Sequence, residues 1–225
     1  MSFSQNPQVI VRRPESVLAT NKLIRNTYML LSMTLLFSAV TAGIAMATNM
    51  PYMGALITLG GYFGLLFLTT SLRNSAWGLL SIFALTGFMG LTLGPMINAY
   101  LNFYSNGSQL VMTAMGGTAA IFLGLSSYAL TTRKDFSFMG GYIFVGILVA
   151  FLAGIGAMIF SIPALSLAVS AVFILLMSGY ILYLTSEMVH GGETNYIMAT
   201  ISLYVAIYNL FTSLLHILGA VAGED

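Results

Sequence analysis

The chain has 225 residues, of which 58% are hydrophobic and 6% are charged, and its formal net charge is +1. Soluble domains carry about 25% charged residues, so this composition excludes a water-soluble fold and predicts a membrane protein. The near-neutral charge gives no indication of a nucleic-acid partner. Because cysteine is absent, disulfides and thiolate metal sites are excluded. The length suits one compact bundle rather than two domains.

The first segment, residues 1–26, is polar and carries four of the seven basic residues. It lacks the early apolar core of a signal peptide. We expect it to be a cytoplasmic tail, followed by a membrane domain over 27–219 and a short periplasmic tail over 220–225.

Seven apolar stretches follow, each near the roughly twenty residues that cross the hydrocarbon of a bilayer. Polar turns such as Asn49-Met50-Pro51 and His190-Gly191-Gly192-Glu193 separate them. The pattern predicts an all-α, polytopic membrane protein whose consecutive helices pack as antiparallel neighbours, because the connections are short. The expected spans are about 27–48, 52–72, 76–99, 110–131, 137–160, 164–186 and 195–219.

The basic residues all fall on one side of this predicted arrangement. They are Arg12, Arg13, Lys22, Arg25, Arg73, Arg133 and Lys134. Basic residues collect on the cytoplasmic face of inserted proteins. We therefore expect the N-terminus to be cytoplasmic and the C-terminus, with Glu224 and Asp225, to be periplasmic or external.

Small residues recur at helical spacing within several spans, which favours close approach of helix backbones. These residues are Gly90 and Gly94, Ala120 and Gly124, and Gly146, Ala150 and Gly154. A membrane gives little hydrophobic force between helices, so such contacts must supply much of the packing.

One polar side chain lies deep in the last span. Asn209 is about 21 Å along the helix from Asn195, at 1.5 Å per residue. An amide at that depth should face protein or water rather than lipid. Two interpretations stay open, a hydrogen bond to another helix or one wall of a polar cavity.

Two combinations of residues resemble enzyme sites but do not fit one. Ser126 is expected near the cytoplasmic end of its helix and His216 near the outer end of its own, so they cannot form a nucleophile and base. His190, Glu193 and Glu187 lie around a Gly191-Gly192 turn with no second histidine on that side, whereas a zinc site needs three or four ligands. We expect neither catalysis nor a cofactor.

Several polar landmarks resemble those of the Bax-inhibitor family of membrane proteins, and more closely its bacterial YccA-like branch. The matching segments are residues 25–28, 131–138, 170–175, 190–196, 202–204 and 208–211. The resemblance implies a seven-helix bundle with the last helix near its centre. It also implies two activities, a pH-sensitive calcium leak gated by two acidic residues on the sixth and seventh helices, and modulation of the membrane-bound, ATP-dependent protease FtsH.

The positions that correspond to the two family acids hold Leu184 and Ala206, which cannot ionise. A carboxylate pair acts as a proton switch because two close negative charges raise one pKa. Glu187 lies one helical turn beyond Leu184 and is a candidate replacement. The departure weakens the expectation of calcium conduction.

The sequence therefore predicts a non-catalytic inner-membrane modulator of an FtsH-type protease, with the lipid bilayer and that protease as partners. The alternative is a calcium or proton leak channel with Glu187, Asn209, Tyr183 and Tyr204 along its path. A second candidate site is the cytoplasmic loop motif, made of Arg133, Lys134, Asp135, His190 and Glu193.

Overall fold

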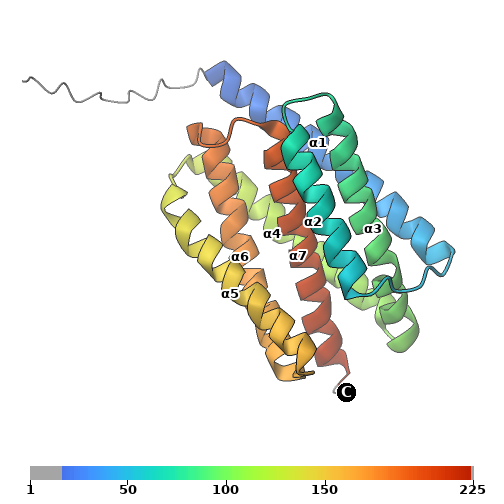
Figure 1. Cartoon of the computed structure of the whole chain (residues 1–225). Helices are drawn as coiled ribbons and strands as arrows, with labels where there is room; N and C mark the ends of the chain where they lie inside the picture. Colours follow the sequence, from blue (N-terminus) through green and yellow to red (C-terminus); the bar gives the residue numbers. More distant parts are fainter. Residues whose placement is uncertain (1–16, 224–225) are drawn as a thin grey trace, which may run out of the picture.

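The computed structural model describes residues 17–223, and these residues form a bundle of seven long helices (Figure 1). Each of the seven is long and apolar enough to cross a membrane, which confirms the predicted all-α, seven-span architecture. Their bounds are α1 Val17–Ala47, α2 Ala55–Leu72, α3 Trp77–Phe103, α4 Gly107–Thr132, α5 Gly140–Ile159, α6 Pro163–His190 and α7 Tyr196–Ala222, with a 3₁₀ turn, η1, at Ser137–Met139.

Helix α7 occupies the centre of the bundle, as the family resemblance implied. It packs against α1, α3, α4 and α6, whereas α2 packs mainly on α3 and α5 on α6. Leu203, Leu210 and Leu215 of α7 have no exposed surface. In Figure 1, α7 runs between the other helices with its C-terminal end at the lower edge of the bundle.

Helix α1 begins at Val17 rather than near residue 27. Leu23, Thr27 and Leu30 are buried at helical spacing, while Lys22 and Arg25 on the same stretch are exposed. An amphipathic stretch of this kind continues the helix beyond the apolar run that marks a membrane span. The remainder of the expected tail, residues 1–16, lies outside the described residues.

The expectation that consecutive helices are neighbours is wrong for two pairs. Helix α1 packs chiefly on α3 rather than α2, and α4 packs on α7 and α6 rather than α5. A short loop determines where two helix ends meet. The small residues on a helix determine which of its faces can pack closely against another helix. A methyl group at Gly90 would overlap the Ser38 carbonyl of α1. Ala120 and Gly124 instead lie exposed on the outer surface.

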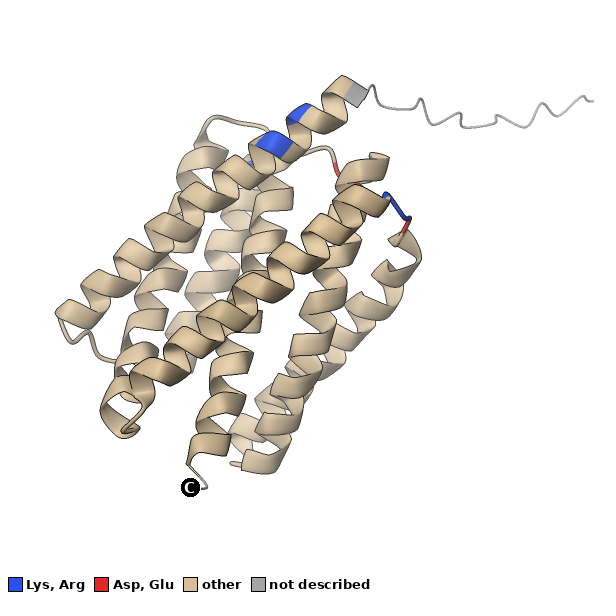
Figure 2. Cartoon of the chain, turned by 180° about the vertical axis from the view of Figure 1, so that it is seen from behind, with Lys and Arg blue, Asp and Glu red and all other residues tan. Residues whose placement is uncertain are grey.

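The described charged residues all lie at one end of the bundle, where α1 begins and α6 ends (Figure 2). We call this the charged end, and the opposite end, where α7 finishes, the uncharged end. The charged end carries Lys22, Arg25, Arg73, Arg133, Lys134, Asp135, Glu187 and Glu193. This asymmetry is what the predicted cytoplasmic location of the basic residues requires, and the direction of insertion stays a prediction.

Candidate functional site

At the charged end, hydrogen bonds centred on Ser186 and His190 hold the α4–α5 connection against the end of α6. The backbone N–H of Phe136 donates to Ser186 Oγ at 2.9 Å, and Ser186 Oγ donates to Lys134 O at 3.3 Å. His190 Nδ1 lies 2.9 Å from Ser186 O, and His190 Nε2 lies 3.1 Å from Arg133 O. Of the predicted loop motif, these bonds join His190 to the backbone carbonyl of Arg133 and, through Ser186, to that of Lys134, whereas Glu193 bonds within its own loop.

The two ring nitrogens of His190 both face carbonyl oxygens, which only accept hydrogen bonds. A neutral imidazole has one N–H and an imidazolium has two. The Ser186 hydroxyl also lies 3.3 Å from Nδ1, so a ring with one N–H can donate from Nε2 to Arg133 O while Nδ1 faces that hydroxyl. This arrangement makes His190 a clamp between the end of α6 and the α4–α5 connection.

The α6–α7 connection is fastened to the α2–α3 loop. Gly191, with φ 77°, takes the left-handed conformation that ends α6, and its N–H bonds to Glu187 O. Asn195 caps α7 with its Oδ1, and its Nδ2 donates to Arg73 O at 3.0 Å. Glu193 Oε1 accepts the Asn195 N–H at 2.7 Å. Glu193 thus helps to shape this turn.

The clamp gives a first prediction. His190→Ala removes both ring hydrogen bonds, and we expect it to weaken the α4–α5 connection by about 1–2 kcal/mol. Amide hydrogen exchange over residues 133–139 should accelerate about tenfold, because 1.4 kcal/mol is a factor of ten. Thr131→Ala is the matched control, since that hydroxyl bonds only within its own helix. If the exchange rates of residues 133–139 are unchanged in His190→Ala, the hydrogen bonds of His190 do not stabilise the α4–α5 connection.

Asp135 gives a pH prediction for the same loop. The backbone N–H of Ser137 donates to Asp135 Oδ1 at 2.8 Å. This bond, a second from the Ser137 hydroxyl and the charge of His190 lower the pKa of the exposed Asp135 carboxyl. The turn is therefore stable above the ordinary aspartate range and opens as pH falls through the lowered value. Carboxyl NMR should show the pKa of Asp135 below the ordinary aspartate range, and Ser137→Ala should move it upward.

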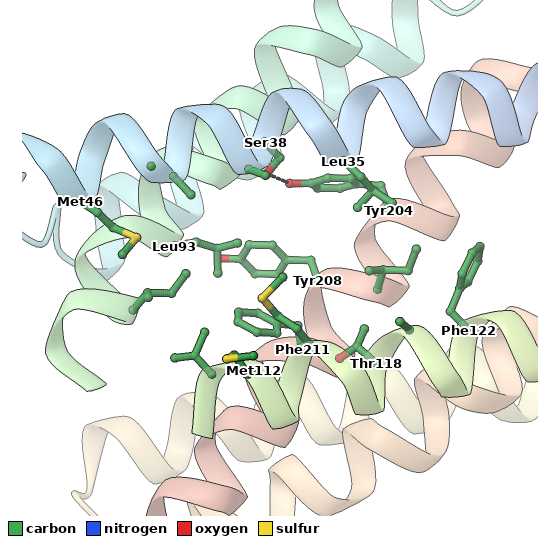
Figure 3. A pocket seen from close by; sticks show the side chains of 18 of the residues that line it. Leu35, Ser38, Met46, Leu93, Met112, Thr118, Phe122, Tyr204, Tyr208 and Phe211 are labelled. Atoms are coloured by element: carbon green, nitrogen blue, oxygen red, sulfur yellow. Dashed lines mark hydrogen bonds between the residues drawn. The ribbon is translucent and has the colours of Figure 1, made fainter. Parts of the chain in front are cut away.

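Tyr204 lies in the core, where its hydroxyl ties three helices together. It is 2% exposed, and its OH lies 2.6 Å from Ser38 Oγ of α1 and 3.3 Å from Thr86 O of α3. The first of these contacts is drawn in Figure 3. Tyr204 is thus a packing residue whose polar atom is satisfied. The pairing of Ser38 with Tyr204 could not be foreseen from the sequence, although a serine in mid-span is a signal that some partner exists.

The other candidates for an ion pathway do not join Tyr204. Tyr183 stacks against Tyr180 at a centroid distance of 6.2 Å and lies beside Gly140 at the start of α5. Asn209 Nδ2 donates to Val205 O within its own helix at 2.8 Å, so it forms neither the expected link to another helix nor part of the cavity described below. Glu187 sits in the last turn of α6. Of these four residues, only Tyr204 lines the pocket described below.

The positions predicted to correspond to the two family acids belong to the hydrophobic core. Leu184 is 7% exposed and Ala206 is 0% exposed, and both pack in the main cluster of buried residues. Within residues 17–223, no three His, Asp or Glu side chains come together as a metal site. Ser126 and His216 are far apart along the bundle axis, and His216 Nδ1 instead lies 2.8 Å from Ser170 Oγ of α6.

A family model described as "Inhibitor of apoptosis-promoting Bax1" matches residues 20–223. The chain belongs to this Bax-inhibitor family. It is 54% identical to an uncharacterized protein of Pseudomonas aeruginosa, with 90% of each chain covered. It is 51% identical to a protein of Escherichia coli named modulator of FtsH protease YccA, over 91% of this chain and 92% of the relative. An uncharacterized membrane protein of Vibrio cholerae is 45% identical over 94% and 95%.

Proposed function

We propose that this member of the Bax-inhibitor family is a non-catalytic inner-membrane modulator of an FtsH-type, ATP-dependent protease. The observation that carries the proposal is the 51% identity to the protein named modulator of FtsH protease, which extends over nearly the full length of both chains. A second Escherichia coli relative of the same identity is named an inner membrane protein. In this proposal the charged end of the bundle faces the cytoplasm.

The mechanism needs a segment that the protease can grip and a bundle that resists being pulled apart. Residues 1–16, which lie outside the described residues, are a polar segment that directly precedes α1 in the sequence, and α1 begins at the charged end. The bundle resists extraction because Gly87, Gly90 and Gly94 let α3 pack directly against α1. A gripped protein that is hard to extract occupies the protease and slows the degradation of other clients.

The test is retention of the protease by a tagged form of this chain in mild detergent. We expect the full chain to retain an FtsH-type protease, and a chain lacking residues 2–16 to lose most of it while keeping the same helical content. A substitution on the outer surface, Gly60→Leu, is the control that should leave retention unchanged, because its added side chain meets open space. Equal retention by the shortened chain would rule out the grip on this segment.

The described residues supply no observation that favours the alternative, a calcium or proton leak. Buried Leu184 and Ala206 stand where the two acids would be needed, and neither can bind a cation or a proton. The loop carboxylates Glu193 and Asp135 accept hydrogen bonds from backbone N–H groups of their own loops. We therefore propose the modulator function alone.

A further inference from the structure

A pocket of about 700 Å³ opens in the side wall of the bundle between α1 and α4 (Figure 3). Helices α3 and α7 form its inner wall, where Tyr208 and Phe211 project toward the opening. The rim is exposed on both sides, at Ala39 and Gly43 of α1 and at Met112 of α4. Because the outer surface of a membrane bundle faces hydrocarbon, the pocket opens toward lipid.

Apart from Ser108 at its outer end, the polar side chains that line the pocket already have partners in the protein. Tyr204 OH is paired with Ser38 Oγ at 2.6 Å, and Tyr208 OH with Thr92 Oγ1 at 3.0 Å. Thr118 Oγ1 donates to the Ala114 carbonyl of its own helix. No charged residue lines the pocket. An ion would lose its hydration there without replacement, which costs several kcal/mol or more, so the occupant must be apolar.

The pocket is elongated along the helices that line it. Its lining runs along α4 from Ser108 to Leu123, which is about 22 Å of helix, and along α1 from Leu35 to Met46, about 16 Å. One leaflet contributes about 15 Å of hydrocarbon. The lined length is therefore that of one leaflet and a little more, which suits an extended hydrocarbon chain lying along the helices.

We propose that this pocket binds one acyl chain of a phospholipid from the leaflet at the uncharged end. Hydrocarbon next to the bundle fills the pocket because the side chains that line an empty apolar cavity lose van der Waals contacts. The rim residues Ala39 and Gly43 are small enough to let the chain pass inward to Phe211. At its outer end the pocket reaches Ser108, next to the uncharged polar residues Asn106 and Gln109, where the phospholipid head group lies.

The experiment uses the full chain in vesicles of phosphatidylethanolamine and phosphatidylglycerol that contain a phospholipid with a photoreactive group near the end of one acyl chain. After illumination, labelled residues are identified by mass spectrometry. We expect label on Tyr208 and Phe211 of the central helix, as well as on outer surfaces. This result is diagnostic because Tyr208 and Phe211 line the pocket that opens between α1 and α4.

Two variants separate specific binding from contact with bulk lipid. Gly43→Leu adds a side chain at the rim without a clash, since no atom lies within 4 Å of the added Cβ, and it should reduce label on α7 several-fold. Gly60→Leu adds the same side chain at an equally open site on α2, outside the pocket, and should have no effect. If Gly43→Leu does not fold, Ala39→Leu serves the same purpose.

Three outcomes would overturn the assignment. Label confined to outer surfaces would mean that no acyl chain enters. Equal labelling of α7 in Gly43→Leu and the unmodified chain would mean that lipid does not use this opening. Light-independent capture of a second copy of this chain across α1 and α4, shown by crosslinks between rim residues, would give the pocket a protein occupant instead.

Discussion

Replacing Gly90 by leucine should destabilise the bundle by about 3 kcal/mol or more, the upper part of the range for overpacked cores. The added Cβ would overlap the Ser38 carbonyl and the Thr41 hydroxyl of α1, so the backbones of α1 and α3 would have to separate. That separation also breaks the contact between Ser38 and Tyr204. The measurement is reversible unfolding in mixed micelles, followed by helical circular dichroism.

The matched control is Gly124→Leu, which adds the same side chain where no atom lies within 4 Å. It should change the unfolding free energy by less than about 0.5 kcal/mol, as surface substitutions usually do. In the proposed mechanism a weakened bundle is extracted, so Gly90→Leu should be degraded by the protease while Gly124→Leu is not. Equal stability of the two variants would mean that α1 and α3 are not held by this close contact.

Introducing a carboxylate at Ala206 should cost about 3–5 kcal/mol, the penalty for leaving a buried charge without a partner. Ala206 has no exposed surface and lies in the same cluster as Leu184, which offers no hydrogen bond. Ala206→Asp therefore tests whether the position predicted for a family acid is inaccessible to water in this chain. Unfolding of the variant in mixed micelles gives the value directly.

Ala206→Ser is the control for Ala206→Asp, because a serine hydroxyl in a helix can bond to the carbonyl four residues earlier and remain satisfied. We expect it to cost about 1 kcal/mol or less. An aspartate tolerated as well as the serine would show that solvent reaches this site. The leak-channel alternative would then regain support.

The membrane architecture could be predicted from the sequence because the bilayer itself sets the length of an apolar run. The seven spans and the gathering of charge at one end follow from that constraint. The start of α1 at Val17 could not be predicted from that constraint. Its first turns carry the exposed charged residues Lys22 and Arg25, so they are not part of an apolar run. The packing of α4 on α7 could not be predicted either, because the length of a loop does not determine which face a helix turns toward its neighbours.

The candidate site was predictable in part for a similar reason. His190 and Arg133 stood out as polar residues in turns, and turns on one side of a membrane lie close together. Their contacts run through Ser186 and backbone carbonyls, which a residue pattern does not reveal. The contact between Ser38 and Tyr204 joins residues 166 positions apart and depends on how α1 and α7 face each other. The pocket between α1 and α4 likewise depends on how these two helices are placed against α3 and α7, which a residue pattern does not reveal.

The measurement that tests the central claim is the rate at which a reconstituted FtsH-type protease degrades a second membrane protein. Vesicles contain the protease, that client and increasing amounts of this chain, with ATP supplied from the cytoplasmic side. The full chain should slow degradation of the client in proportion to its amount, and a chain lacking residues 2–16 should not. An unchanged rate with the full chain, or equal inhibition by the shortened chain, would contradict the account.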